Sequence, residues 1–211
     1  GHWSRLLQIF DDEATIRHFY GGTDKYALID TYRDQLALAQ RLRCEYVVFH
    51  PVHAELEYIY NWKFPWTWQT TVDLAADIIN EVTADTEYKG LILFENLWWP
   101  GNFRLDGPEE IERLLGRVEY PHCGIVLDTG HLLNKNPSIR SEAHGITYIV
   151  DSVKALGSLA ATIKAVHLTR SLSADYVTAA RSTADPYSGA RTFWERLAIA
   201  REHVQKIDKH N

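Results

Sequence analysis

The sequence predicts an α/β fold built as a (β/α)₈ TIM barrel, and three observations carry this prediction. Four short apolar runs, bounded and rich in β-branched or aromatic residues, are typical of buried parallel strands; they span residues 46–49, 91–94, 124–127 and 163–166. The segments between them carry helical patterns, and alternating strands and helices indicate a parallel sheet with crossover helices. Each strand–helix unit takes about 35–45 residues, as in a barrel of roughly 250 residues.

Helices are expected between and after these strands. Residues 1–26 show no clear element, but Thr23 or Asp24 could cap a helix over 28–42, where apolar side chains recur at helical spacing. Gly107-Pro108-Glu109-Glu110 is a good helix start, with proline in the first turn and acids near the positive end of the dipole; this helix should end near Gly116. Further helices are expected from Thr70 or Thr71 to about 83, at 149–156 and at 193–207, with aromatic loops at 58–68 and 96–101 and a polar linker at 169–188.

The length of 211 residues suits one domain over residues 1–211. A closed barrel needs eight strands and four are recognised, so we expect an incomplete barrel whose terminal strands are missing; the chain, which has no methionine, could be truncated at both ends. An open Rossmann-like sheet is the alternative fold. Against it, no strand is followed by a glycine-rich phosphate loop of the GxGxxG or GxxxxGK[ST] type.

Composition argues for a soluble protein with a small-molecule partner. The net charge is −6, so a broad positive field for a nucleic-acid backbone is not expected. No apolar run approaches the roughly 20 residues of a membrane span, and the first residues lack the design of a signal peptide. Cys44 and Cys123 form no CxxC pair and are expected to be reduced, packed thiols. A cytoplasmic location follows.

Each strand ends on a residue that can hold a metal: His50, Glu95, Asp128 and His167. The carboxyl ends of parallel strands form the reactive face of such sheets, so these four side chains should meet at one mouth. Asp128 also begins Asp128-Thr129-Gly130-His131, and a carboxylate with an imidazole three residues on suits Zn²⁺ or Mn²⁺.

Structural alternatives exist for every one of these residues. A DxxH pair is common by chance, Glu95 could be a carboxylate paired with an arginine or lysine, and the histidines could be hydrogen-bonded core residues. Asp208-Lys209-His210, taken alone, is favoured as a polar helix terminus. The coincidence across four strands is what favours a metal site.

Five pieces of the chain, in this order, resemble the xylose isomerase-like TIM barrels. They are Phe49-His50-Pro51, Phe94-Glu95-Asn96, Leu127-Asp128-Thr129-Gly130-His131, Val166-His167-Leu168 and Ile207-Asp208-Lys209-His210. This superfamily joins sugar phosphate isomerases and epimerases with the endonuclease IV type of apurinic endonuclease (AP endonuclease family 2). The resemblance runs from about residue 46 to 210.

The resemblance implies different metal sites in the two branches. In the endonuclease type, the ligand positions of a trinuclear zinc site correspond to His50, Glu95, Asp128, His131, His167, Asp208 and His210. In the epimerase type, a single Mn²⁺, Mg²⁺, Zn²⁺ or Co²⁺ is held at the positions of Glu95, Asp128 and His167 plus a glutamate on the last strand, and His131 touches the substrate. The chain departs from both patterns, because the histidine of the second strand and the closing glutamate are not found.

The leading hypothesis is a divalent-metal-dependent isomerase or epimerase that acts on a sugar or sugar phosphate by proton abstraction. The resemblance makes Glu95 both a ligand and an acid/base, with His131 beside the substrate. Trp62, Trp66, Trp98 and Trp99 could cover apolar sugar faces, although packing or an oligomer interface explains them equally well. Lys63, Arg104 or Arg170 could meet a phosphate, but a solvated charge is favoured for each.

Two other functions remain open. An apurinic-site endonuclease would use His50, His131, Asp208 and His210, which a single-metal isomerase does not need. Against it, the net charge of −6 leaves few lysine and arginine clusters to contact the phosphates of DNA. A barrel relative without activity, serving as a binding module, is the third hypothesis.

Overall fold

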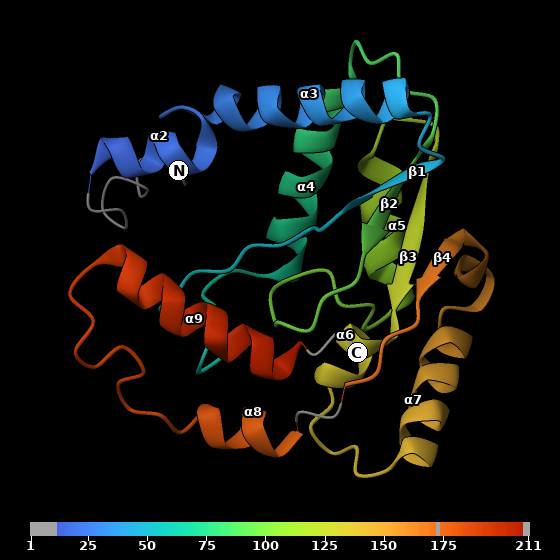
Figure 1. Cartoon of the computed structure of the whole chain (residues 1–211). Helices are drawn as coiled ribbons and strands as arrows, with labels where there is room; N and C mark the ends of the chain where they lie inside the picture. The colour runs from blue at the N-terminus through green and yellow to red at the C-terminus, as the bar shows by residue number, and fades with distance from the viewer. Residues whose placement is uncertain (1–11, 172–173, 209–211) are drawn as a thin grey trace.

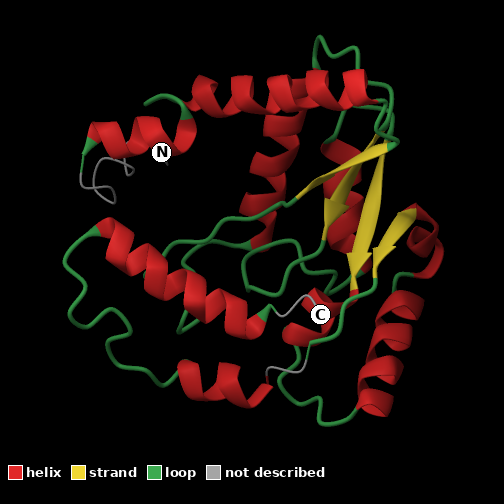
Figure 2. Ribbon diagram, in the orientation of Figure 1, coloured by secondary structure: helices red, strands yellow, loops and turns green. Residues whose placement is uncertain are grey.

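The computed structural model describes residues 12–171 and 174–208 and contains one parallel sheet of four strands (Figure 2). The strands are β1 (Tyr46–Phe49), β2 (Leu91–Glu95), β3 (Cys123–Asp128) and β4 (Ile163–His167), and all four predicted strands are confirmed. They pair in the order β1-β2-β3-β4, each parallel to the next. This unbroken order is that of a barrel sector, whereas a doubly wound sheet reverses its order at a switch point.

Helices cover one face of the sheet (Figure 1). The main hydrophobic core lies between the sheet and these helices. α4 (Trp68–Thr83) packs against α5 (Pro108–Arg117), and α3 (Lys25–Leu42) packs against α4. The central strands β2 and β3 are almost entirely buried, whereas the edge strands β1 and β4 are partly exposed. The buried side chains of this core include Phe94, Ile125, Val72, Ile111 and Leu114.

Five further α-helices and one 3₁₀ helix complete the described part of the chain. They are α2 (Glu13–Tyr20), α6 (Thr129–Asn134), α7 (Glu142–Ala155), the 3₁₀ helix η1 (Gly157–Thr162), α8 (Ala174–Ala180) and α9 (Phe193–Ile207). α8 and α9 contact each other, and α6 lies directly after β3 (Figure 1). In the described part of the chain, no helix combines the length and the apolar character needed to cross a membrane.

Helix starts are where the structure corrects the sequence-based predictions. Asp24 caps α3, as predicted, through hydrogen bonds from the backbone N–H groups of Tyr26 and Ala27. α4 begins at Trp68, before Thr70, because the Thr67 hydroxyl already caps it. α7 begins at Glu142, seven residues before the predicted start, with Ser141 as its cap.

Two further helices form where none was expected. The segment predicted as a polar linker at 169–188 contains α8, and the unassigned amino-terminal region contains α2, capped by Asp12. Both helices are short. Among the described side chains of α8, only Val177 and the terminal Ala180 are buried and apolar. Two such residues do not form an apolar stripe that the sequence could reveal.

Candidate metal centre

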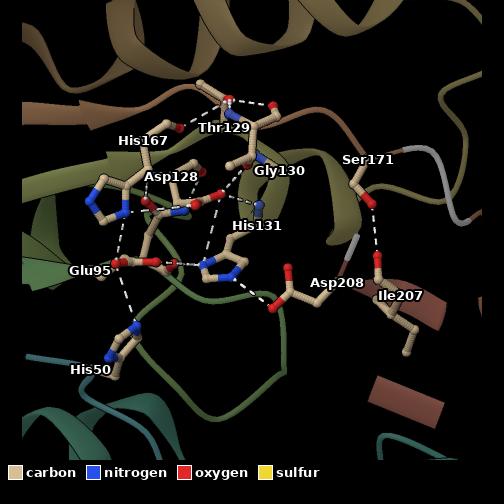
Figure 3. Close-up of polar contacts among 12 residues, drawn as sticks. His50, Glu95, Asp128, Thr129, Gly130, His131, His167, Ser171, Ile207 and Asp208 are labelled. Carbon is tan, nitrogen blue, oxygen red and sulfur yellow. Dashed lines mark hydrogen bonds and ion pairs between the residues drawn. The ribbon is translucent and has the colours of Figure 1, made fainter. Parts of the chain in front are cut away.

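Glu95 lies at the end of β2 and is the hub of the site (Figure 3). Its Oε1 is 3.1 Å from Nδ1 of His131, and its Oε2 is 3.1 Å from Nδ1 of His167 and 3.4 Å from Nε2 of His50. The carboxylate itself is buried. Three imidazoles from three different segments therefore converge on one carboxylate, instead of the arginine or lysine that the structural alternative required.

Asp128 ends β3 beside Glu95 and is fully buried. Its Oδ1 accepts hydrogen bonds from the backbone N–H of His131 at 2.7 Å and from the Thr169 hydroxyl at 2.9 Å. No residue that the structure describes hydrogen-bonds its Oδ2, and Nδ1 of His167 lies 3.9 Å away. A buried carboxylate oxygen without a hydrogen bond is costly, and a cation at this position would remove the cost.

A cation fits the donor set. Glu95, Asp128 and His131 each offer a ligand atom, and these atoms lie within 4.8 Å of one another. Carboxylate oxygens with imidazole nitrogens suit Zn²⁺, Mn²⁺ or Co²⁺. His167 also borders this group, since its Nδ1 faces both carboxylates.

Asn96 ties the two acidic strand ends together. Its side-chain oxygen accepts the backbone N–H of Asp128 at 2.8 Å, and its amide nitrogen donates to the Asp128 carbonyl at 3.1 Å. The Asn96 carbonyl lies 2.8 Å from Nδ1 of His131. Because a carbonyl only accepts, this nitrogen carries the proton, and Nε2 of His131 is left to face Asp208 at 3.4 Å.

The charges in the cluster shift the pKa values of its members in opposite directions. Burial would raise the pKa of Glu95, but hydrogen bonds from His131 and His50 outweigh it and hold that pKa far below its usual range. Burial would lower the pKa of His131, but hydrogen bonds to Asp208 and Glu95, with the charge of Asp128, raise it to about 10. The three carboxylates around His131 therefore make the cluster a place where positive charge is favoured.

The structure brings together six of the seven residues singled out in the sequence. His50 and His167 are the more exposed histidines, and Asp208 follows the end of α9, a segment distant in sequence from the strands. His210 lies outside the described residues. The sequence analysis assigned no role to Thr169. Its position two residues after His167 was the only local indication that it could lie at the site.

Comparisons with known proteins bear on this chain in three ways. The model of the xylose isomerase-like TIM barrel family matches residues 21–175. No curated protein matches the chain. A solved structure described as a D-tagatose 3-epimerase-like protein is similar at 20% identity and a TM-score of 0.48; the match covers 85% of this chain and 59% of that one. This chain thus spans less than two thirds of the length of that protein.

Proposed function

Because the chain belongs to the xylose isomerase-like TIM barrel family, we propose that it is a divalent-metal-dependent isomerase or epimerase of a sugar or sugar phosphate. The observation that carries the proposal is the meeting of Glu95, Asp128 and His167: Nδ1 of His167 lies 3.1 Å from Glu95 and 3.9 Å from Oδ2 of Asp128, an oxygen without a hydrogen-bond partner among the described residues. Such an oxygen, next to two imidazoles and a second carboxylate, is what a resident cation requires.

In this proposal, Glu95, Asp128 and His167 hold the metal, and His50, His131 and Asp208 surround it. A bound divalent ion would polarise a substrate carbonyl or hydroxyl and stabilise negative charge on its oxygen. Glu95 serves as a ligand and as one acid/base; the depressed pKa of its carboxyl favours the ligand role.

His131 is the proposed proton donor to a substrate oxygen. Its Nδ1 is fixed by the Asn96 carbonyl, so Nε2 is the nitrogen that can exchange Asp208 for a substrate. With a pKa of about 10 in the metal-free site, the ring holds its second proton at neutral pH. A metal ion would add positive charge nearby and lower this pKa toward the range useful for acid–base catalysis.

Metal content and isotope exchange test the proposal together. We expect purified protein reconstituted with Mn²⁺ to hold one ion per chain and to exchange deuterium from D₂O into a ketose at the carbon beside the carbonyl. Chelation should abolish the exchange and Mn²⁺ should restore it. A protein that binds no ion after reconstitution would contradict the proposal and favour a binding module.

An apurinic-site endonuclease is the second candidate. The observation that favours it is the pair of outer contacts, His50 to Glu95 and His131 to Asp208, both at 3.4 Å, because a single ion does not need them. Three zinc ions per chain and cleavage of a duplex with one abasic site would establish this function. One ion and an intact duplex would exclude it.

A further inference from the structure

The short helix α6 and the loop that follows β2 are attached to each other at two places. The first is at the candidate metal centre, where the Asn96 carbonyl lies 2.8 Å from Nδ1 of His131. The second is about one helical turn further along the chain, at Lys135, which caps the end of α6. Its Nζ donates hydrogen bonds to the carbonyls of Arg104 and Leu105, at 3.0 and 2.8 Å. Lys135 therefore holds the end of α6 on the loop.

The ammonium group of Lys135 has a full set of acceptors. Its third partner is Oδ1 of Asp106, at 3.0 Å, so its three N–H groups have three oxygens to bind. The side chain is only 4% exposed. Glu110, in α5, is also buried and accepts hydrogen bonds from the backbone N–H groups of residues 104, 105 and 106. A lysine and a glutamate thus fix the backbone at the end of this loop.

One of the three cations that the sequence offered for a phosphate belongs to this group. Lys63 and Arg170 are exposed, as the sequence analysis favoured. Arg104 differs from that expectation, because its side chain is only 18% exposed and its Nε lies 3.5 Å from Oδ2 of Asp106. Arg104 is therefore part of the charged group at the end of the loop.

The formal charges of this group balance. Arg104 and Lys135 are its cations. Asp106 and Glu110 are its carboxylates, and Glu110 accepts N–H groups on both of its oxygens. A neutral group avoids the cost of a buried charge without a partner, and it leaves no excess charge for a ligand. Its role lies in the geometry that it fixes.

A buried lysine is weak evidence for stability. Removing charges from water costs about as much as their attraction regains, and apolar side chains of similar volume often replace such pairs without loss. An apolar side chain, however, cannot fix the positions of three oxygens relative to α6. Since α6 meets the loop near Asn96 and again at residues 104–106, it can neither slide nor turn on the loop. A single attachment would leave rotation about that point possible.

The imidazole of His131 depends on this arrangement. Its Nδ1 lies 3.1 Å from Oε1 of Glu95, and the Asn96 carbonyl accepts from the same nitrogen. The loop between the two attachments is closed by a hydrogen bond from the Leu97 N–H to the Phe103 carbonyl, at 2.7 Å. Movement at the end of the loop would therefore be transmitted to Asn96, and from there to the ring.

We propose that Lys135 is a positioning residue for His131: its ammonium group fixes α6 on the loop after β2 and so keeps the imidazole beside Glu95 and the substrate. This inference rests on the proposed function, in which His131 donates a proton to a substrate oxygen. Lys135 acts only through α6 and the loop. Misplacing a reacting group by about 1 Å can slow a reaction about a hundredfold, so small shifts of α6 matter.

Hydrogen exchange of the His131 ring tests the proposal in the metal-free chain. The Nδ1–H, held by the Asn96 carbonyl, should be protected from exchange with water in NMR spectra of ¹⁵N-histidine-labelled protein. Lys135→Met keeps the apolar stem and removes the ammonium group, and it should lower this protection about tenfold. A merely stabilising role would lower the protection of the ring no more than that of the backbone amides of β3.

Two further variants complete the test. Lys164→Met is the matched control, because Lys164 is exposed and its Nζ donates to the Ala161 carbonyl at 2.9 Å; the His131 ring should keep its protection. Asp106→Asn keeps the test valid if Lys135→Met does not fold, since the Asp106 side chain is 50% exposed. It weakens one of the three bonds of the ammonium group and should lower the ring protection about threefold.

Kinetics of the Mn²⁺-loaded protein give a second readout. Lys135→Met should lower kcat for deuterium exchange about tenfold and change KM and the Mn²⁺ dissociation constant less than about twofold, because the proposed metal ligands are not altered. Unchanged ring protection in Lys135→Met and Asp106→Asn, or an equal loss in Lys164→Met, would overturn the positioning role.

The positioning role and the proposed function fail separately. If the wild type catalyses no isotope exchange but Lys135→Met still loosens the His131 ring, only the isomerase assignment is removed. If the wild type catalyses the exchange and Lys135→Met leaves both the ring protection and kcat unchanged, only the role of Lys135 is removed.

Discussion

At the scale of single residues, the site depends on what lies around two carboxylates. Glu95 is surrounded by histidines and Asp128 is held on one oxygen only. Both oxygens of Glu95 have imidazole partners, whereas Asp128 keeps one buried oxygen without a hydrogen bond among the described residues, and this oxygen is preorganised for a ligand. Asp128 is thus the residue whose substitution best separates binding from folding.

Asp128→Asn should weaken Mn²⁺ binding at least tenfold while changing the unfolding free energy of the metal-free protein by less than about 1 kcal/mol. The amide keeps Oδ1, which accepts from His131 and Thr169, and loses only the charge that a metal needs. Calorimetric Mn²⁺ titration and urea unfolding measure the two effects. Asp73→Asn, which removes a surface partner of Arg113, is the control and should leave Mn²⁺ affinity unchanged. A normal affinity in Asp128→Asn would remove this residue from the metal centre.

Thr169→Val should lower the Mn²⁺ affinity about tenfold, because ligands lose precision when their supporting hydrogen bonds are removed. The Thr169 hydroxyl donates to Oδ1 of Asp128 at 2.9 Å and accepts the Gly130 N–H at 2.8 Å, so valine removes one of the two donors to Oδ1 and leaves the Gly130 N–H without this acceptor. Thr147→Val, on the exposed face of α7, is the matched control because its hydroxyl bonds only its own helix. Equal affinities in the two variants would show that Asp128 needs no such support.

At the scale of elements, α9 is anchored by a buried histidine. His203 stacks on Tyr60, with ring centres 3.8 Å apart. Its Nε2 lies 3.2 Å from the Ile59 carbonyl and its Nδ1 lies 2.8 Å from the Tyr176 hydroxyl. The neutral ring satisfies both contacts, since Nε2–H donates to the carbonyl and Nδ1 accepts from the hydroxyl. One side chain therefore joins α9, α8 and the loop after β1.

This anchor predicts a loss of stability in mild acid. Burial lowers the pKa of His203 below its ordinary value of about 6.5, so the folded state resists protonation. The unfolded chain takes up the proton first as the pH falls. The contribution of the neutral ring is therefore complete above pH 6.5 and is lost as the pH falls toward the folded pKa.

His203→Phe checks the prediction, since phenylalanine keeps the stacking and does not titrate. Urea unfolding between pH 7.5 and 5 should show a smaller loss of stability for this variant than for the wild type. The difference between the two slopes isolates His203 from the other histidines. His144→Phe, on the exposed part of α7, serves as the comparison and should retain the wild-type slope. If the unfolding free energies of His203→Phe and the wild type fall equally with pH, His203 does not cause the loss of stability in acid.

At the scale of the whole molecule, the candidate metal centre brings together segments that are not all part of the sheet. His50, Glu95, Asp128 and His167 come from four strand ends, and Asp208 comes from the end of α9 (Figure 3). A cation bound there would link the sheet to the carboxyl-terminal helix. Ligand binding to the folded state alone raises the apparent stability of the whole chain.

Mn²⁺ at 100 times its dissociation constant should stabilise the folded protein by about 2.7 kcal/mol, which corresponds to a rise of roughly 5–10 °C in Tm for a chain of this size. Differential scanning calorimetry with and without Mn²⁺ measures the shift. Mg²⁺ at equal concentration should shift Tm less, because imidazole ligands favour Mn²⁺. An unchanged Tm across the titration would mean that the cluster binds no ion.

The sequence by itself determined the four strands and several helices, because short-range patterns of residues specify them. Each of the four strands is a short apolar run that ends on a polar residue, and α3, α5 and α9 carry their own apolar spacing, caps or dipole-matched charges. The parallel arrangement then placed His50, Glu95, Asp128 and His167 at one edge, because the carboxyl ends of parallel strands share it. These inferences needed only short-range patterns and one topological rule.

Tertiary structure alone decided which atoms meet. The bonds of Asn96 to Asp128, the support from Thr169 and the approach of Asp208 to His131 join residues that are 32, 41 and 77 positions apart. No local pattern encodes such pairs. α2, α8 and the first turns of α7 also escaped the sequence, because short or exposed helical segments bury too few apolar side chains to show a period and depend on neighbours for their stability.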